Sequence, residues 1–152
     1  MDHIDIKILD CLLTNARLAA SVIGERVNLS VSAVIERIKK LENQGIIKQY
    51  TTILDSEKIG KGVTAFISVS LEHPKYNAGF IESVQKCSQI TECHYITGDF
   101  DFLLKVVTQS THSLEDTLNL IKSIKGISLT KTLVVFSTWK RDISVLPDEI
   151  QK

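Results

Sequence analysis

The stretch that decides the fold is Val27-Asn-Leu-Ser-Val-Ser-Ala-Val-Ile-Glu-Arg-Ile-Lys-Lys-Leu-Glu-Asn-Gln-Gly-Ile-Ile47. Ser30 is a typical N-cap, because its hydroxyl can accept a hydrogen bond from a backbone N–H that the first helical turn leaves unpaired. Gly45 follows where a helix usually ends in a left-handed conformation. The apolar residues between them recur at helical spacing on one side, at Val31, Val34, Ile38 and Leu41. This pattern predicts one capped helix with a buried side and a free side.

The free side of this helix is polar and basic. Steps of about 100° per residue place on it Ser32, Glu36, Lys39, Lys40 and Asn43, with Arg37 on the flank. Short polar and cationic groups on a helix held by its other side fit the major groove of DNA. The alternative is an ordinary amphipathic helix whose charges only keep its surface hydrated.

The preceding residues favour DNA binding. A helix is predicted over residues 20–27, and only Asn28 and Leu29 separate it from Ser30. Two helices joined by so short a turn are typical of a helix-turn-helix, plain or winged. A first helix is predicted upstream from the spacing of Ile4, Ile8, Leu9 and Leu12. Three such helices can bury a small common core, and the third would then read the DNA.

The second half of the chain changes to alternating strands and helices. Apolar and polar residues alternate over 63–71, which predicts a half-buried strand. Phe80, Val84 and Cys87 predict a helix, and a second helix is expected from Ser113 to Gly126. Further strands are predicted over residues 92–97, 101–108 and 127–138. The order βαββαβ is ferredoxin-like, so the predicted fold class is α+β.

These patterns predict four segments. Residues 1–46 form the helix-turn-helix domain, 47–62 a linking strand and hinge, 63–138 the ferredoxin-like domain, and 139–152 a loosely held C-terminal tail. The chain of 152 residues, 43% of them apolar, has no run approaching the ~20 apolar residues of a membrane span. Three cysteines without paired spacing and a polar N-terminus predict a cytoplasmic protein. Without His-x-x-x-His or Cys-x-x-Cys spacing, we expect no metal, cofactor or catalytic residue.

The charge distribution predicts that several copies act together. The net charge is zero, but residues 26–50 carry five basic and two acidic side chains, a local excess of +3. Such a modest basic patch predicts weak DNA binding by one copy. One helix-turn-helix reads a half-site, so a homodimer is the expected minimal unit. Four consecutive apolar residues, 133–136, also predict that a partner subunit covers one face of the last strand.

The order and spacing of these pieces resemble the Lrp/AsnC family, the leucine-responsive and asparagine-responsive transcription regulators of bacteria and archaea. The resemblance covers nearly the whole chain, in residues 2–9, 15–18, 29–42, 45–50, 97–104 and 126–132. The second helix departs from the family pattern, because Ala19 and Val22 stand where a capping box is usual and Gly24 lies inside it. This helix is expected to be intrinsically weak and held by packing.

The resemblance implies two sites. The expected DNA-contacting residues are Ser30, Ser32, Ala33, Glu36, Arg37, Lys39 and Lys40. Those near the helix start would face base edges, whereas the arginine and the lysines would mainly contact phosphates. Glu36 would accept from a cytosine amino group or pair with Lys40 one turn on. The expected effector-binding residues, in a cleft between neighbouring dimers, are Gly98, Asp99, Phe100, Asp101, Thr130 and Thr132.

In that cleft, backbone N–H groups would bind the carboxylate of an amino acid, Asp99 or Asp101 its ammonium group, and the threonines would add hydroxyl groups. Gly98–Asp101 is also explained as a tight turn. The expected function is a sequence-specific DNA-binding transcriptional regulator whose DNA binding or assembly responds to a small effector. By the resemblance, its dimers would gather into an octamer. Two alternatives stay open, a haem-precursor decarboxylase of the same fold and an architectural DNA-binding protein without an effector.

Overall fold

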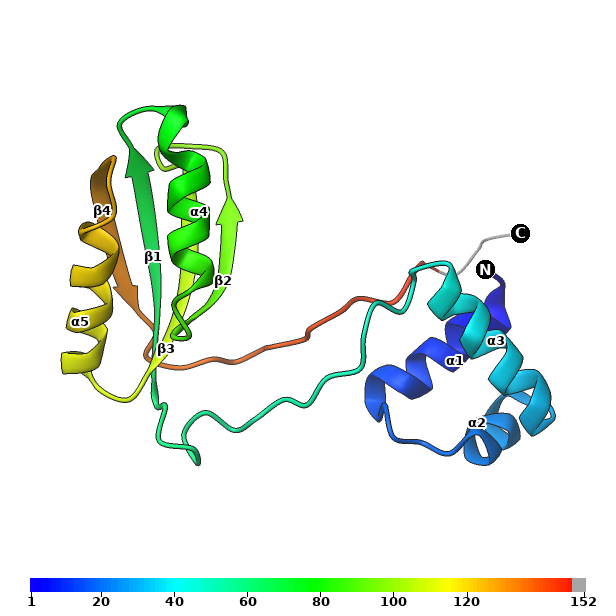
Figure 1. Cartoon of the computed structure of the whole chain (residues 1–152). Helices are drawn as coiled ribbons and strands as arrows, with labels where there is room; N and C mark the ends of the chain where they lie inside the picture. Colours follow the sequence, from blue (N-terminus) through cyan, green and yellow to red (C-terminus); the bar gives the residue numbers. More distant parts are fainter. Residues whose placement is uncertain (149–152) are drawn as a thin grey trace. The chain divides into compact units, whose positions relative to one another are not determined.

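The computed structural model describes residues 1–148, and its contacts divide the chain into two units (Figure 1). Among the described residues, one unit contains 1–52 and 140–148, and the other contains 53–139. The last four residues of the predicted tail lie outside the described residues. Among the helices of residues 1–148, none is long and apolar enough to cross a membrane.

The first unit is built from three helices, α1 (His3–Thr14), α2 (Ala20–Val27) and α3 (Val31–Asn43). Asp2 and Asp5 form a capping box at the start of α1, and the Ser30 hydroxyl accepts from the Ala33 N–H at 3.3 Å at the start of α3. No side chain caps α2, as its sequence predicts. The common core consists of Ile8, Cys11, Ile23, Val27 and Val34.

The turn between α2 and α3 depends on Gly24 and Asn28. Asn28 has a φ of 55°, and the Leu29 N–H donates to the Gly24 carbonyl at 3.0 Å. A Cβ atom on Gly24 would lie 2.6 Å from the Leu29 carbonyl oxygen. The glycine that weakens α2 as a helix is therefore what allows the turn to close tightly on it.

The predicted ends of α3 are confirmed, but one predicted core residue is not. Gly45 has a φ of +70°, and the Ile46 N–H returns to the Leu41 carbonyl at 3.0 Å. Val34 and Leu41 are buried, whereas Val31 is 46% exposed. Val31 is the first helical residue, one turn before Val34, so it lies at the margin of the core.

The second unit is a four-stranded antiparallel sheet with the strand order β2-β3-β1-β4. Its elements in chain order are β1 (Val63–Leu71), the short helix η1 (Pro74–Tyr76), α4 (Asn77–Gln85), β2 (Ile90–Tyr95), β3 (Phe102–Thr108), α5 (Thr111–Lys122) and β4 (Ile127–Val134). This arrangement confirms the predicted βαββαβ order.

Several boundaries differ from the prediction: β2 covers Ile90–Tyr95 rather than 92–97, and α5 ends at Lys122 rather than at Gly126. Helix α5 begins two residues earlier than expected, because Ser110 is its N-cap and Ser113, the third helical residue, completes the capping box. Strand β4 ends at Val134 rather than at residue 138, and the Val135 N–H makes a last bond to the Thr64 carbonyl at 2.9 Å. Strand β1 begins at Val63, so the residues that follow Val135 have no further β1 residue to pair with.

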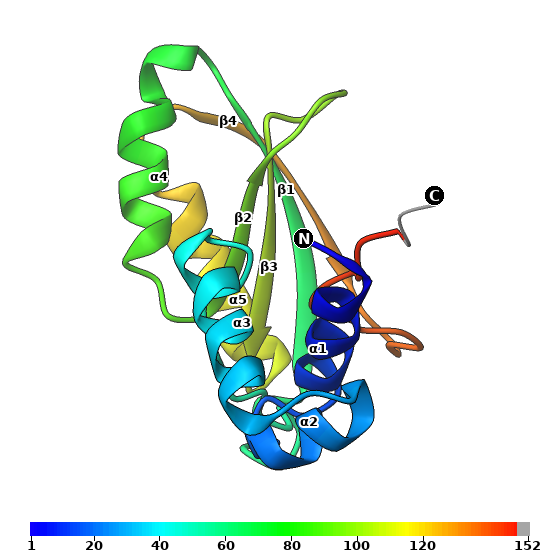
Figure 2. The same ribbon diagram turned by 90° about the vertical axis from the view of Figure 1, so that its right-hand side faces the viewer.

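Both helices of the second unit cover the same face of the sheet (Figures 1 and 2). The core between these helices and the sheet contains Ala65, Ile67, Val69, Phe80, Val84, Phe102, Leu104, Val106, Leu114 and Ile121. The strand register places Phe66, Leu103 and Leu133 on the opposite face. No helix of the described unit covers that face, and Leu133 is 53% exposed there.

The segment predicted as a linking strand has no regular secondary structure. Within residues 47–62 there is only a turn around residues 56–60. A strand exists by hydrogen bonding to a neighbouring strand. The sheet of the described residues uses only β1 to β4, so this segment has no partner within the chain.

Candidate nucleic-acid interface and effector site

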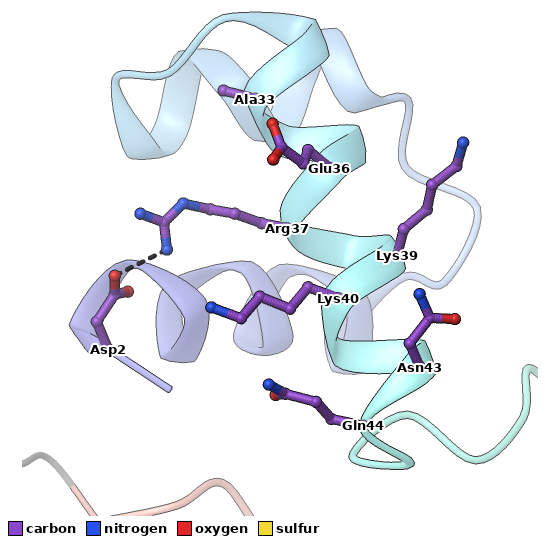
Figure 3. Close-up of a pocket in the computed structure, with 8 residues that line it drawn as sticks. All are labelled: Asp2, Ala33, Glu36, Arg37, Lys39, Lys40, Asn43 and Gln44. Atoms are coloured by element: carbon purple, nitrogen blue, oxygen red, sulfur yellow. Dashed lines mark hydrogen bonds and ion pairs between the residues drawn. The ribbon is translucent and has the colours of Figure 1, made fainter.

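The free face of α3 forms one side of a shallow surface depression of about 650 Å³. The side chains that line it are Asp2, Ala33, Glu36, Arg37, Lys39, Lys40, Asn43 and Gln44 (Figure 3). Glu36, Lys39 and Lys40 are exposed. Among the ion pairs of the described residues, none includes these three, so the alternative pairing of Glu36 with Lys40 is not formed.

The hydroxyl groups of the two serines at the start of α3 have different hydrogen-bond partners. The Ser30 hydroxyl lies 3.3 Å from the Ala33 N–H that it caps, and 3.1 Å from the Ser32 hydroxyl. Ser32 is exposed and holds no cap. Ser32 can therefore exchange its hydroxyl contact for one with a ligand at little cost, whereas Ser30 is needed by the helix.

Arg37 is held by two carboxylates of α1. Its Nη1 donates to Asp2 Oδ2 at 2.8 Å and to Asp5 Oδ1 at 2.7 Å. The Asp5 backbone N–H and the Arg37 guanidinium lower the pKa of Asp2 from 3.8 to about 2. The sequence spacing of Asp2 and Asp5 indicates a capping box, but carries no signal for an arginine more than 30 residues away.

Tyr50, which follows α3 in the chain, forms a hydrogen bond to the last turn of that helix. The Tyr50 hydroxyl donates to Glu42 Oε1 at 2.9 Å. Partial burial and the Glu42 carboxylate raise the pKa of Tyr50 to about 12. Neither residue was expected to contribute to a site, because an i, i+8 contact across a helix end has no sequence signature.

The predicted effector residues Gly98–Asp101 form the turn between β2 and β3, and this turn is anchored to the end of β1. Gly98 has a φ of +112°. The Asp101 N–H donates to the Val69 carbonyl at 3.0 Å, and its Oδ2 accepts from the Leu71 N–H at 2.7 Å. The Asp101 carboxylate therefore shapes the turn, whereas the Asp99 side chain is exposed.

The two predicted threonines lie across β1 from this turn. Thr130 is opposite Val69 and Thr132 is opposite Ile67, so both share the face that the helices cover, and both are half-buried. The turn leads into β3 on one side of β1, while the threonines belong to β4 on the other. Two strand spacings separate β3 from β4 by about 10 Å. The structure brings the two motifs to the same sheet without direct contact between them.

Two further observations concern other chemistries. In residues 1–148, no cluster of three or more His, Cys, Asp or Glu side chains is arranged to hold a metal ion. Cys93 is exposed on β2, and partial burial of its sulfur raises the pKa of the thiol. A raised pKa makes a thiol less reactive, so Cys93 has no feature of a nucleophile.

Comparison with known proteins identifies both units. Residues 64–145 match the family model of the Lrp/AsnC ligand binding domain, and residues 1–48 match a winged helix-turn-helix DNA-binding model. The HTH-type transcriptional regulator FL11 of Pyrococcus horikoshii is 35% identical over 140 residues, which cover 92% of each chain. The leucine-responsive regulatory protein of Klebsiella pneumoniae is 32% identical, covering 93% of this chain and 88% of its own.

A solved structure is similar over nearly the whole chain. A transcriptional regulator from Neisseria meningitidis, in complex with L-Met, has a TM-score of 0.91 and 33% sequence identity. The similarity covers 95% of this chain and 96% of that one. These relatives are named as regulators, in agreement with the expected function rather than with the decarboxylase alternative.

Proposed function

Since this chain belongs to the Lrp/AsnC family of DNA-binding transcriptional regulators, we propose that α3 is its DNA-reading helix and that its sheet unit binds an amino acid effector. The observation that carries the DNA-reading role is the free face of α3, where Lys39 and Lys40 are exposed and form no ion pair among the described residues. The opposite side of the same helix is anchored by buried Val34 and Leu41.

The residues near the start of α3 are the ones that read bases. Recognition helices present their N-terminal residues to base edges. Ser32 and Glu36 are exposed there, beside the half-buried Ala33. A carboxylate accepts hydrogen bonds but cannot donate them, so Glu36 favours a cytosine, whose amino group points into the major groove. Lys39 and Lys40, farther along, contact phosphates.

Salt-dependent DNA binding tests this assignment. Each lost phosphate contact lowers the slope of log K against log salt by about 0.9, so Lys39→Ala and Lys40→Ala should each weaken binding to all sequences alike. Lys122→Ala on α5 removes an exposed lysine from the other unit and should leave the slope unchanged. A double Lys39→Ala, Lys40→Ala variant that binds as tightly as the native protein would show that α3 is not the reading helix.

The effector is proposed to bind beside the turn at Gly98–Asp101. The solved relative in complex with L-Met supports an amino acid as the ligand class. The Asp99 carboxylate is exposed, so it is better suited to an ammonium group than the Asp101 carboxylate, which already accepts the Leu71 N–H. Thr130 and Thr132 lie about two strand spacings away, so a ligand that uses both motifs needs groups from a second copy.

The identity of the effector can be tested by thermal unfolding in the presence of each of the twenty amino acids. A ligand at 100 times its Kd stabilises the folded state by about 2.7 kcal/mol. The effective amino acid should also change the affinity for DNA. If none of the twenty changes either quantity, the chain acts on DNA without an amino acid effector, as the architectural alternative requires.

Assembly through the open face of the sheet is the last part of the proposal. Leu129 and Leu133 are more than half exposed on that face, and a second copy would remove both from water. We expect a homodimer in solution, gathering into an octamer at higher concentration. Leu133→Lys should shift the population toward monomer in light scattering, because it places an unpaired charge in the interface. A native protein that is monomeric at micromolar concentration would contradict the dimer.

A further inference from the structure

We infer that Arg37 is a positioning residue that fixes α3 against the start of α1, and that it does not contact phosphate. This inference rests on the proposed DNA-reading role of α3, and it removes Arg37 from the set of phosphate-binding residues expected from the sequence. The two carboxylates that hold it, Asp2 and Asp5, then support DNA binding although both are negatively charged, as DNA is.

The carboxylates that hold Arg37 have no unpaired oxygen. Asp2 Oδ1 accepts from the Asp5 N–H at 2.9 Å, and Asp5 Oδ2 accepts from the Asp2 N–H at 2.8 Å. The remaining oxygens, Asp2 Oδ2 and Asp5 Oδ1, both accept from Arg37 Nη1. All four carboxylate oxygens therefore have a partner, and no other ion pair of the described residues involves them. Figure 3 shows the arginine directed from α3 toward Asp2.

Burial explains why Arg37 stays in this place when DNA arrives. The Asp5 side chain is only 6% exposed, and Arg37 is its one cationic partner within residues 1–148. Turning the guanidinium toward a phosphate would leave a nearly buried carboxylate without its counter-charge, which is among the most costly changes in a folded protein. Lys39 and Lys40 can contact phosphates without such a loss, because they are exposed and break no ion pair.

The position of Arg37 on α3 explains what the contact controls. Arg37 follows Glu36 directly and lies one turn beyond Ala33, so it is next to the proposed base-reading residues. Its partners cap the first turn of α1. The contact thus sets the angle and height at which α3 leaves the core formed with α1. A helix that is displaced or tilted presents its side chains to the wrong base edges even when they are unchanged.

The direction in which Asp5→Asn changes the affinity for DNA distinguishes a positioning role of Arg37 from phosphate binding. Asp5→Asn removes a negative charge from a DNA-binding unit, and simple electrostatics then predicts tighter binding. The positioning role predicts the opposite, because the arginine loses the buried one of its two charged partners. We expect Asp5→Asn and Arg37→Gln each to weaken DNA binding. The slope against log salt should stay unchanged in both, and the double variant should be no weaker than the weaker single one.

The matched controls use the same titrations. Lys40→Ala should lower the slope by about 0.9, which tests the proposed function separately from the role of Arg37. Arg37→Lys keeps the charge, but its ammonium group lies closer to the helix than Arg37 Nη1, so the variant should bind DNA more weakly than the native protein. Asp2→Asn changes the more exposed partner, 54% accessible, and keeps the test valid if Asp5→Asn does not fold. It should weaken binding less, again with an unchanged slope.

Three results would overturn the inference. The first is tighter binding and a steeper slope for Asp5→Asn or Asp2→Asn, which would mean that a released Arg37 contacts phosphate. The second is a slope lowered by about one for Arg37→Gln. The third is native affinity for Arg37→Lys. If Lys40→Ala and Lys39→Ala leave binding unchanged, the proposed reading helix fails instead.

Discussion

Replacing Asp101 with alanine should destabilise the sheet unit far more than replacing Asp99, although both lie in the same turn. Asp101 Oδ2 accepts the Leu71 N–H at 2.7 Å at the end of β1. Alanine leaves this N–H without a partner, which costs about 1–3 kcal/mol when the group is buried. Leu71 is half-buried, so water can replace part of the lost bond. We therefore expect a loss of about 1–2 kcal/mol.

Thermal unfolding gives the measurement. For a domain of this size, each kcal/mol shifts the Tm by about 4–8 °C, so Asp101→Ala should lower the Tm of the sheet unit by about 4–16 °C. Asp99→Ala changes an exposed side chain and should stay within about 0.5 kcal/mol of the native protein. Protein concentration must be held constant, because association itself raises the Tm. Asp101→Asn keeps an acceptor oxygen and should fall between the two alanine variants.

The same variants separate stability from effector binding. Asp99→Ala should fold normally and lose the amino acid-dependent change in DNA affinity, because its exposed carboxylate is the proposed ligand for the ammonium group. An Asp101→Ala variant that unfolds within about 1 °C of the native protein would refute the assigned role of its carboxylate. Equal losses of Tm in the two alanine variants would refute the distinction between the two aspartates.

Two further predictions concern the helical unit. Gly24→Ala should destabilise it by about 1–2 kcal/mol, because the clash with the Leu29 carbonyl outweighs the gain in helix propensity; Ser21→Ala in the same helix should be neutral or stabilising in denaturant titrations. The pKa of Asp2 is lowered on folding from 3.8 to about 2, so its contribution to stability is complete above about pH 4 and is lost as the pH falls toward 2. The difference in unfolding free energy between the native protein and Asp2→Asn should therefore vanish below about pH 2, and a difference that persists there would contradict the contacts of the Asp2 carboxylate with the Asp5 N–H and Arg37 as its source.

Local patterns predicted both ends of α3 and the order of the elements. The Ser30 cap, the Gly45 end and the alternation in β1 are patterns within a few residues, and such patterns act through the backbone of their own segment. The order βαββαβ follows from the same local patterns taken one after another. The candidate residues of α3 were also identified from local spacing, which places them on one helix face, whereas those of the Gly98 turn were expected only from the family resemblance.

The contacts that several of these residues make come from the tertiary fold. The sequence assigned Arg37 to phosphate and left the two aspartates of the turn equivalent, but contacts across more than 30 residues commit Arg37 to Asp5, and contacts across 30 residues commit Asp101 to Leu71. Packing also explains Gly24: the sequence indicates only that it weakens the helix, whereas in the structure its missing side chain leaves room for the Leu29 carbonyl. Residues 47–62, predicted as a linking strand, have no partner strand within the chain, and a strand needs a partner that its own residues cannot supply. Contacts of this kind depend on which distant segments are packed together, and this cannot be predicted from the spacing of residues along the chain.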